Sequence, residues 1–206
     1  QASRWSANFD GVNDYAQLPP ISGVQGLSMW VWIDPQQLQN PNWIVAGKTA
    51  VTGRKHRRQL LNEAVFLSTE GAGSAFESLF VDAVAQPLNW TSLPKAKWAH
   101  IHLETFTPFD DALALMAASA GSPPSTAGNL RGLVAELYVW SRKLTTRELN
   151  GVYQGWDAQA NDGSLLAYYN MEEGQISQNY DRLKDVTGQM DDGRLFNGAF
   201  FIISVP

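Results

Sequence analysis

Hydrophobic and polar residues alternate along several short stretches, and the clearest of them is LSMWVWI, residues 27–33. Its odd-numbered positions are aliphatic, while Trp30 and Trp32 occupy even-numbered positions. Successive side chains of a β-strand point to opposite faces, so this pattern predicts a strand with one aliphatic and one aromatic face. Because both faces are apolar, we expect the strand to lie inside a layered structure.

Further short apolar runs follow along the chain and predict more strands. They are residues 43–45, 64–67, 79–81, 98–103, 133–140 and 200–205. Gly, Pro, Asn and Asp gather between these runs, as expected for antiparallel strands that are joined by turns. Residues 112–120 are ambiguous, because the alanines favour a helix whereas Leu113 and Leu115 suit a strand.

One segment has the pattern of a short helix. Thr145 and Glu148 have the spacing of a capping box, in which each side chain binds a free main-chain amide at the start of a helix. Leu149, Val152 and Tyr153 then recur at helical spacing. The predicted fold class is therefore all-β and antiparallel, with one short helix near residues 145–154.

Composition narrows the classes of function. A length of 206 residues suits one all-β domain, and the net charge of −5 argues against nucleic-acid binding driven by overall charge. The chain has no cysteine, which excludes disulfides and thiolate metal sites, and no apolar run approaches the length of a membrane span. Because the sequence starts at Gln1 and not at Met, we expect it to be a piece of a longer protein.

Several stretches in order resemble the laminin-G-like and pentraxin-like branch of the concanavalin A-like lectin/glucanase superfamily. They are ANFDGVNDYAQLP from residue 7, LSMWVWIDPQQL from 27, LPKAKWAHIHLETF from 93 and LRGLVAELYVWSRKLTTREL from 130. LLAYYNMEEG from residue 165, followed by DVTGQMDDGRLFNG from 185, is similar to the closing segment of such domains. The resemblance implies one concanavalin A-like domain over residues 1–206, folded as a jelly-roll sandwich of two facing sheets.

The sequence lacks the carboxylate set of the hydrolases in this superfamily. Their laminarinase-type members use Glu-x-Asp-x-Glu on one strand, and a retaining mechanism needs two carboxylates about 5 Å apart. Here the matching strand offers Glu136 alone, and one carboxylate cannot serve as both nucleophile and acid. No Gly-x-Ser-x-Gly motif is present either. We therefore expect the protein not to be an enzyme.

The turn that follows the first predicted strand is a candidate calcium site. Asp10, Asn13 and Asp14 supply three oxygen-bearing side chains within five residues, and calcium prefers such ligands. In relatives, a structural calcium links this turn to the late strand, which implies Glu136 as the fourth ligand. The alternative is a hairpin turn that is capped by its own amides and holds no ion.

Two further clusters carry polar chemistry. His100 and His102 are two residues apart, with Glu104 next on the same predicted face; the pattern can bind zinc, but a structural role is favoured. Four basic residues on an acidic chain form a candidate site for a sulfated polyanion, with a solvated loop as the alternative. They are Arg54, Lys55, Arg57 and Arg58.

Six of the eight tryptophans divide into two groups. Trp30, Trp32 and Trp98 lie in strong strand patterns, which places them in the core. The three nearer to loops are candidates for stacking on sugar rings, and they are Trp43, Trp90 and Trp156. Asn89 begins an N-glycosylation sequon, Asn-Trp-Thr, which has meaning in a secreted eukaryotic chain.

These observations favour a non-catalytic binding module of an extracellular or cell-surface protein. Its expected partner is a glycan or an extracellular protein, and recognition is lectin-like or adhesive. The alternative is a structural domain that makes protein–protein contacts within a larger complex and binds no sugar. Nucleic acid and membrane insertion are not expected.

Overall fold

The computed structural model describes residues 4–36, 43–50, 57–62, 77–87, 92–116, 129–155 and 163–204. For residues 43–50 and 57–62 it describes the course of the main chain only. The predictions for Asn89, Trp90, Trp156, Arg54 and Lys55, and the strand expected at residues 64–67, lie outside the described residues.

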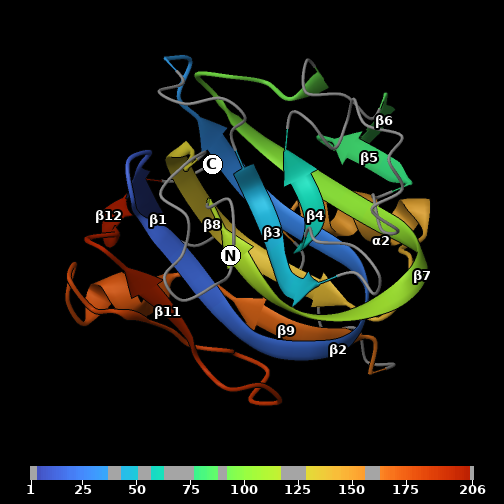
Figure 1. Cartoon of the computed structure of the whole chain (residues 1–206). Helices are drawn as coiled ribbons and strands as arrows, with labels where there is room; N and C mark the ends of the chain where they lie inside the picture. The colour runs from blue at the N-terminus through green and yellow to red at the C-terminus, as the bar shows by residue number, and fades with distance from the viewer. Residues whose placement is uncertain are drawn as a thin grey trace.

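Strands make up most of the described chain (Figure 1). The strands are β1 (Trp5–Asp10), β2 (Tyr15–Ile33), β3 (Trp43–Ala50), β4 (Arg57–Asn62), β5 (Ser78–Val81), β6 (Val84–Gln86), β7 (Trp98–Leu115), β8 (Arg131–Trp140), β9 (Leu165–Tyr169), β10 (Arg182–Leu183), β11 (Gly193–Phe196) and β12 (Phe200–Ile203). The helices are α2 (Thr146–Tyr153) and the short 3₁₀ helix η2 (Glu172–Gln175). The all-β class is thus confirmed, and the ambiguous segment from residue 112 is strand as far as Leu115.

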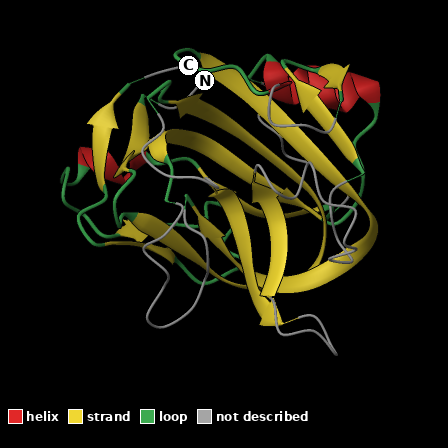
Figure 2. Ribbon diagram, turned by 45° about the horizontal axis from the view of Figure 1, so that its top comes forward, coloured by secondary structure: helices red, strands yellow, loops and turns green. Residues whose placement is uncertain are grey.

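The described strands all pair antiparallel and form two layers. β12, β1, β8, the second half of β2, the first half of β7, β5 and β6 form the first layer, with β9 beside β8. β10, β11, the first half of β2, the second half of β7, β3 and β4 form the second layer. The two long strands therefore pass from one layer into the other, which gives the sandwich (Figures 1 and 2).

The passage between the layers is marked by irregular pairing of β2 with β7. The register shifts three times between Gln17 and Gly26. Gly23 adopts a left-handed φ of 74° there, and its N–H donates to Asp110 Oδ1 at 2.8 Å. The side chain of Gln25 donates to the carbonyls of residues 105 and 106 at 3.3 Å. These bonds satisfy main-chain groups that the bend leaves unpaired.

The predicted alternation of residues 27–33 is confirmed. The aliphatic side chains at the odd positions are at most 1% exposed and belong to the core between the layers. Trp30 and Trp32 point the other way, and both are partly exposed, as is Trp98. Their predicted place in the core is therefore wrong, because the second face of the strand is an outer face of the first layer.

The turn between β1 and β2 does not form the expected hairpin. β1 pairs with β12 and β8, while β2 pairs with β7, β8 and β11, so the two strands that flank the turn are not partners. The turn instead leads the chain from the first layer into the second. Gly11 is needed in it, because its φ is 76° and an added Cβ would lie 2.7 Å from Cβ of Arg131.

Helix α2 forms where the capping box predicted it. The Thr145 hydroxyl accepts the N–H of Glu148 at 3.3 Å, and the Glu148 carboxylate accepts the N–H of Thr145 at 2.8 Å. Val152 packs with Tyr138, Trp140 and Leu165, so the helix covers part of the outer face of the first layer. Neither described helix has the length and apolarity needed to cross a lipid bilayer.

We predict that Thr145→Ala destabilises the protein by about 1 kcal/mol, because the substitution removes the acceptor for a free amide at the start of α2. Chemical denaturation followed by circular dichroism measures the free energy of unfolding. Thr145→Ser keeps the hydroxyl and should unfold close to the wild-type midpoint. Equal midpoints for the alanine and serine variants would show that the capping bond contributes nothing.

Candidate functional site

An aromatic surface lies on the outer face of the first layer. Trp32 on β2 is directly opposite Trp98 on β7. Two residues away on the same face, Trp30 is opposite His100. α2 adds Tyr153, whose ring stacks against Trp30 at 5.7 Å between centroids. We call Trp30, Trp32, Trp98 and Tyr153 the aromatic platform; all four side chains are partly exposed.

Trp32 and Trp98 belong to a row of paired residues that continues across the strands of the layer and contains no charged side chain. Leu133 on β8 pairs with Trp32, Asn8 on β1 pairs with Leu133, and Phe200 on β12 pairs with Asn8. All three are partly exposed. The surface beside the platform is thus apolar, with one neutral amide, over the width of several strands.

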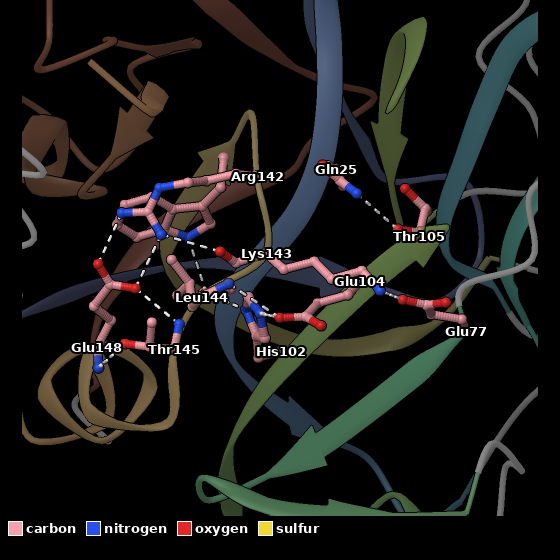
Figure 3. Close-up of polar contacts among 12 residues, drawn as sticks. Gln25, Glu77, His102, Glu104, Thr105, Arg142, Lys143, Leu144, Thr145 and Glu148 are labelled. Carbon is pink, nitrogen blue, oxygen red and sulfur yellow. Dashed lines mark hydrogen bonds and ion pairs between the residues drawn. The ribbon is translucent and has the colours of Figure 1, made fainter. Parts of the chain in front are cut away.

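A chain of buried hydrogen bonds lies on the same face as the platform, and Figure 3 shows its part from His102 through Glu104 to Leu144. Trp140 Nε1 lies 3.1 Å from Ser28 Oγ, which is 2.7 Å from His102 Nδ1. His102 Nε2 lies 3.1 Å from Glu104 Oε1, and this oxygen also accepts the N–H of Leu144 at 3.1 Å. Ser28 and His102 are completely buried, and Glu104 is 6% exposed.

The donors fix the direction of this chain. The Glu104 carboxylate accepts, so His102 Nε2–H donates to it, and Nδ1 of the neutral imidazole is then an acceptor. Ser28 Oγ accepts from the Trp140 indole N–H and donates its own hydrogen to His102 Nδ1. Hydroxyl, imidazole and carboxylate follow in the order of a hydrolase triad, but Ser28 Oγ is already bonded to both Trp140 and His102 within the core of the layer. The chain of bonds is structural.

Ion pairs anchor the segment that leads into α2. The Arg142 guanidinium bridges both carboxylate oxygens of Glu148 at 2.7 and 2.9 Å, and Lys143 contacts Glu77. The hydrogen bond from Arg142, aided by the main-chain bond from Thr145, lowers the pKa of Glu148 to about 2. Together with the Leu144 bond to Glu104, these contacts hold α2 against the layer and so position Tyr153.

His100 differs sharply from His102, although the two residues share one strand face. The imidazole of His100 is 1% exposed, and neither nitrogen has a hydrogen-bond partner within the described structure. Burial, with a smaller effect from His102, lowers the pKa of His100 to about 3, so the ring is neutral at physiological pH. Its nearest rings are Trp30 at 5.3 Å and Tyr153 at 5.9 Å.

The predicted calcium residues are only partly brought together. Asp10, Asn13 and Asp14 share the turn, where Asp10 Oδ1 accepts main-chain N–H groups from residues 12, 13 and 14. Asp14 is buried and its Oδ2 accepts the N–H of Asp10 at 3.0 Å. This burial, and more weakly the Asp10 carboxylate, raises the pKa of Asp14 to about 6, against the opposing effect of the Asp10 hydrogen bond.

Glu136 does not join this turn. It lies on β8 five positions beyond Arg131, which pairs with Asp10, and this separation corresponds to roughly 17 Å along a strand. Glu136 is buried and has a φ of 50°, at the bulge where the pairing of β8 changes from β1 to β9. No group of three or more His, Asp or Glu residues within the described ranges has the geometry of a metal site.

Sequence reasoning missed Asn129, which faces the turn from the start of the segment before β8. Its amide nitrogen donates to the main-chain oxygen of Asp14 at 2.9 Å. Asn129 Oδ1 and Asp14 Oδ1 are both buried oxygens without a hydrogen-bond partner in the described part of the chain. Two buried oxygens of this kind are the donors that a calcium ion takes, so Asn129 replaces Glu136 as the residue that the fold brings to the turn.

The remaining predicted residues are placed only coarsely. Trp43 begins β3, and Arg57 and Arg58 begin β4, which is the last strand of the second layer among the described residues. Arg57 pairs with Ala50. Sugar stacking by Trp43 and polyanion binding by the two arginines stay predictions.

Comparisons with known proteins give a fold likeness. No family model matches the sequence, and no curated protein matches it. A solved structure from Bacteroides ovatus, of a protein proposed to bind carbohydrate, matches 98% of this chain with a TM-score of 0.55 and 18% sequence identity. The match covers 60% of that protein's chain, so the present chain spans about three-fifths of its length. At this identity the likeness shows the fold alone.

We predict that Ser28→Ala destabilises the protein by about 2–4 kcal/mol, because it leaves both Trp140 Nε1 and His102 Nδ1 buried without a partner. Ser6→Ala is a matched control: Ser6 is equally buried in another strand of the first layer, β1, and its hydroxyl has no hydrogen-bond partner in the described structure. Thermal and urea unfolding of the two variants measure the difference. Similar losses for both would contradict the proposed chain of hydrogen bonds.

Proposed function

We propose that this chain is a non-catalytic carbohydrate-binding module of the concanavalin A-like type, exposed outside the cell or on its surface. The observation that carries the proposal is the aromatic platform, in which Trp32 and Trp98 lie side by side on the outer face of a sheet. A flat β-sheet face holds such rings in fixed positions, so a ligand can bind without much reordering of the protein.

Aromatic rings suit sugars for a physical reason. One face of a pyranose ring presents mainly C–H groups, and these pack against the electron-rich face of an aromatic ring while the hydroxyl groups remain free for hydrogen bonds. The uncharged row from Trp98 to Phe200 extends this surface in one direction and suits a ligand of several sugar units. The proposed role of the similar Bacteroides ovatus protein supports the same class of ligand.

The second candidate function is a structural domain that makes protein–protein contacts within a larger complex, since Trp and Tyr are also enriched where proteins meet. One exposed feature favours it: β12 is the outermost strand of the first layer in the described structure, and Ile203 at its end is 71% exposed. An edge strand with an exposed aliphatic side chain can pair with a strand of another chain.

We predict that Trp32→Ala and Trp98→Ala each weaken glycan binding by about tenfold or more, because each removes one ring of the platform. A glycan array identifies a ligand, and calorimetry with that ligand then measures the affinities. Phe106→Ala is the control, because Phe106 is 77% exposed but lies on the bend of β7, away from the platform. A silent array, together with a stable complex with a neighbouring chain, would favour the assembly role instead.

We further propose a structural calcium ion at the first turn, held by Asp14 and Asn129 with Asp10 and Asn13 close by. The two buried oxygens that have no partner among the described residues support this site, whereas the three main-chain N–H groups bound by Asp10 Oδ1 cap the turn internally as well. The ion would stabilise the connection between the layers and take no part in sugar recognition.

We predict that calcium raises the melting temperature more at about pH 7.5 than at about pH 5. The raised pKa of Asp14 means that its ionised form destabilises the fold as the pH rises through about 6, and a calcium ion would compensate for this charge. Asp14→Asn should abolish the response to calcium, and magnesium is the control ion. Melting curves that are identical in calcium and in chelator at both pH values would contradict the proposed calcium site.

A further inference from the structure

The imidazole of His100 is a buried polar group that the protein leaves unsatisfied. Both main-chain polar groups of His100 bond to Asp82. The N–H of Asp82 donates to the His100 carbonyl at 2.8 Å, and Asp82 Oδ1 accepts the His100 N–H at 2.9 Å. The side chain has no such bond, and both of its nitrogens are without a partner in the described structure. Burying a polar group in this way destabilises a fold, so its retention calls for a reason.

Within the described part of the chain, none of the neighbouring groups supplies the missing hydrogen bonds. Both nitrogens of His102 are engaged, with Ser28 and with Glu104. The Asp82 oxygen that lies close by accepts a main-chain N–H. The side chains packed around the imidazole are the rings of Trp30 and Tyr153, both members of the aromatic platform.

We propose that His100 is the specificity-determining residue of the platform and that it binds a hydroxyl group of a neutral hexose. This inference rests on the carbohydrate-binding function proposed above. The imidazole is 1% exposed beneath Trp30 and Tyr153, so the hydroxyl would reach it after these two stacked rings move apart. A neutral imidazole offers one donor and one acceptor, and a hydroxyl group is both acceptor and donor, so one sugar hydroxyl can satisfy either nitrogen.

The depth of His100 selects the kind of hydroxyl. Trp30 and Tyr153 are partly exposed, whereas the imidazole below them is 1% exposed. A hydroxyl on the pyranose ring lies close to the plane that stacks on the tryptophans, but the exocyclic hydroxymethyl group of a hexose extends one carbon further. A pentose such as xylose lacks this group. A site built around a buried hydrogen-bonding group discriminates strongly against a ligand that lacks the matching hydroxyl.

Charge argues for a neutral sugar. The uncharged imidazole gives no ionic attraction to a carboxylate or sulfate, and the row from Trp98 to Phe200 contains no basic residue. Glu104, which lies on the same strand face as His100, and Asp82, which bonds the main chain of His100, are both acidic. An acidic sugar would therefore be repelled from the position that we assign to the hydroxymethyl group.

The wild-type protein provides the first test, with calorimetric titration of cellohexaose, laminarihexaose, mannohexaose, maltohexaose and xylohexaose. Cellohexaose and xylohexaose have the same β-1,4-linked backbone and differ only in the hydroxymethyl groups. We expect a hexose oligomer to bind best and xylohexaose to bind at least about fivefold more weakly than the best of them. Equal or tighter binding of xylohexaose would overturn the role of His100.

Two variants provide the second test. His100→Phe fills a similar space without polar atoms, so the melting temperature should stay within about 2 °C of wild type or rise, while the hexose preference disappears. His102→Phe should lower the melting temperature by about 5 °C or more, because it breaks the bonds to Ser28 and Glu104. If His100→Phe keeps both the affinity and the preference for hexose, the inference fails.

The two tests separate this inference from the proposed function. Wild-type binding that is lost in Trp32→Ala but unchanged in His100→Phe would keep the carbohydrate-binding function and reject the role of His100. Absence of binding by the wild-type protein to every oligosaccharide of the array and of the titration series would reject both. A variant of His100 that unfolds would also contradict the inference, because a residue without hydrogen-bond partners should be replaceable by an apolar ring.

Discussion

β2 and β7 run side by side through both layers, and their pairing fixes the position of almost everything else. From Gly26 to Trp32 their register is unbroken, with Gly26 opposite Glu104 and Trp32 opposite Trp98. One face of this paired segment supplies the core, with Leu27, Met29 and Ile101 at most 1% exposed. Because side chains alternate, the same register places serine, histidine and tryptophan side chains together on the other face.

That outer face combines two environments within one strand. At His102 the polar groups are buried and fully used, and they join Trp140, Ser28 and Glu104 to the start of α2. Two residues earlier, the imidazole of His100 is buried beneath partly exposed aromatic rings and has no hydrogen-bond partner among the described residues. The first arrangement stabilises the fold, whereas the second lowers its stability. Natural proteins tolerate such a cost mainly at sites that serve binding or catalysis.

Local sequence patterns predicted the local structure well. The alternation at residues 27–33 and the capping box at Thr145 and Glu148 both depend on neighbouring residues, and both are confirmed. The exposure of Trp30, Trp32 and Trp98 could not be predicted, because periodicity shows which residues share a face but not what covers that face. The hairpin prediction for the first turn was wrong for a related reason: a turn sequence does not reveal whether its flanking strands are partners.

Contacts between distant residues account for the rest. Ser28 and Trp140 are 112 positions apart, and Asn129 and Asp14 are 115 apart, so neither pair has a signal in the sequence. His100 and His102 look alike in the sequence, and only the register of β2 and β8 makes one of them structural. Ser28 lies opposite His102 and Tyr138, whereas Trp30 lies opposite His100 and Ala135.

The shared register also links the proposed binding surface to the stability of the fold. Shifting β2 by one residue against β7 would carry Trp30 and Trp32 into the core and would expose Met29 and Val31 to solvent. The same shift would separate Ser28 from His102 and remove the bonds that hold α2, and with it Tyr153, against the layer. The platform therefore cannot be lost by slippage without loss of the core. A surface of this kind can bear an unsatisfied imidazole, because the pairing that positions His100 is stabilised by residues on the opposite face of the same strands.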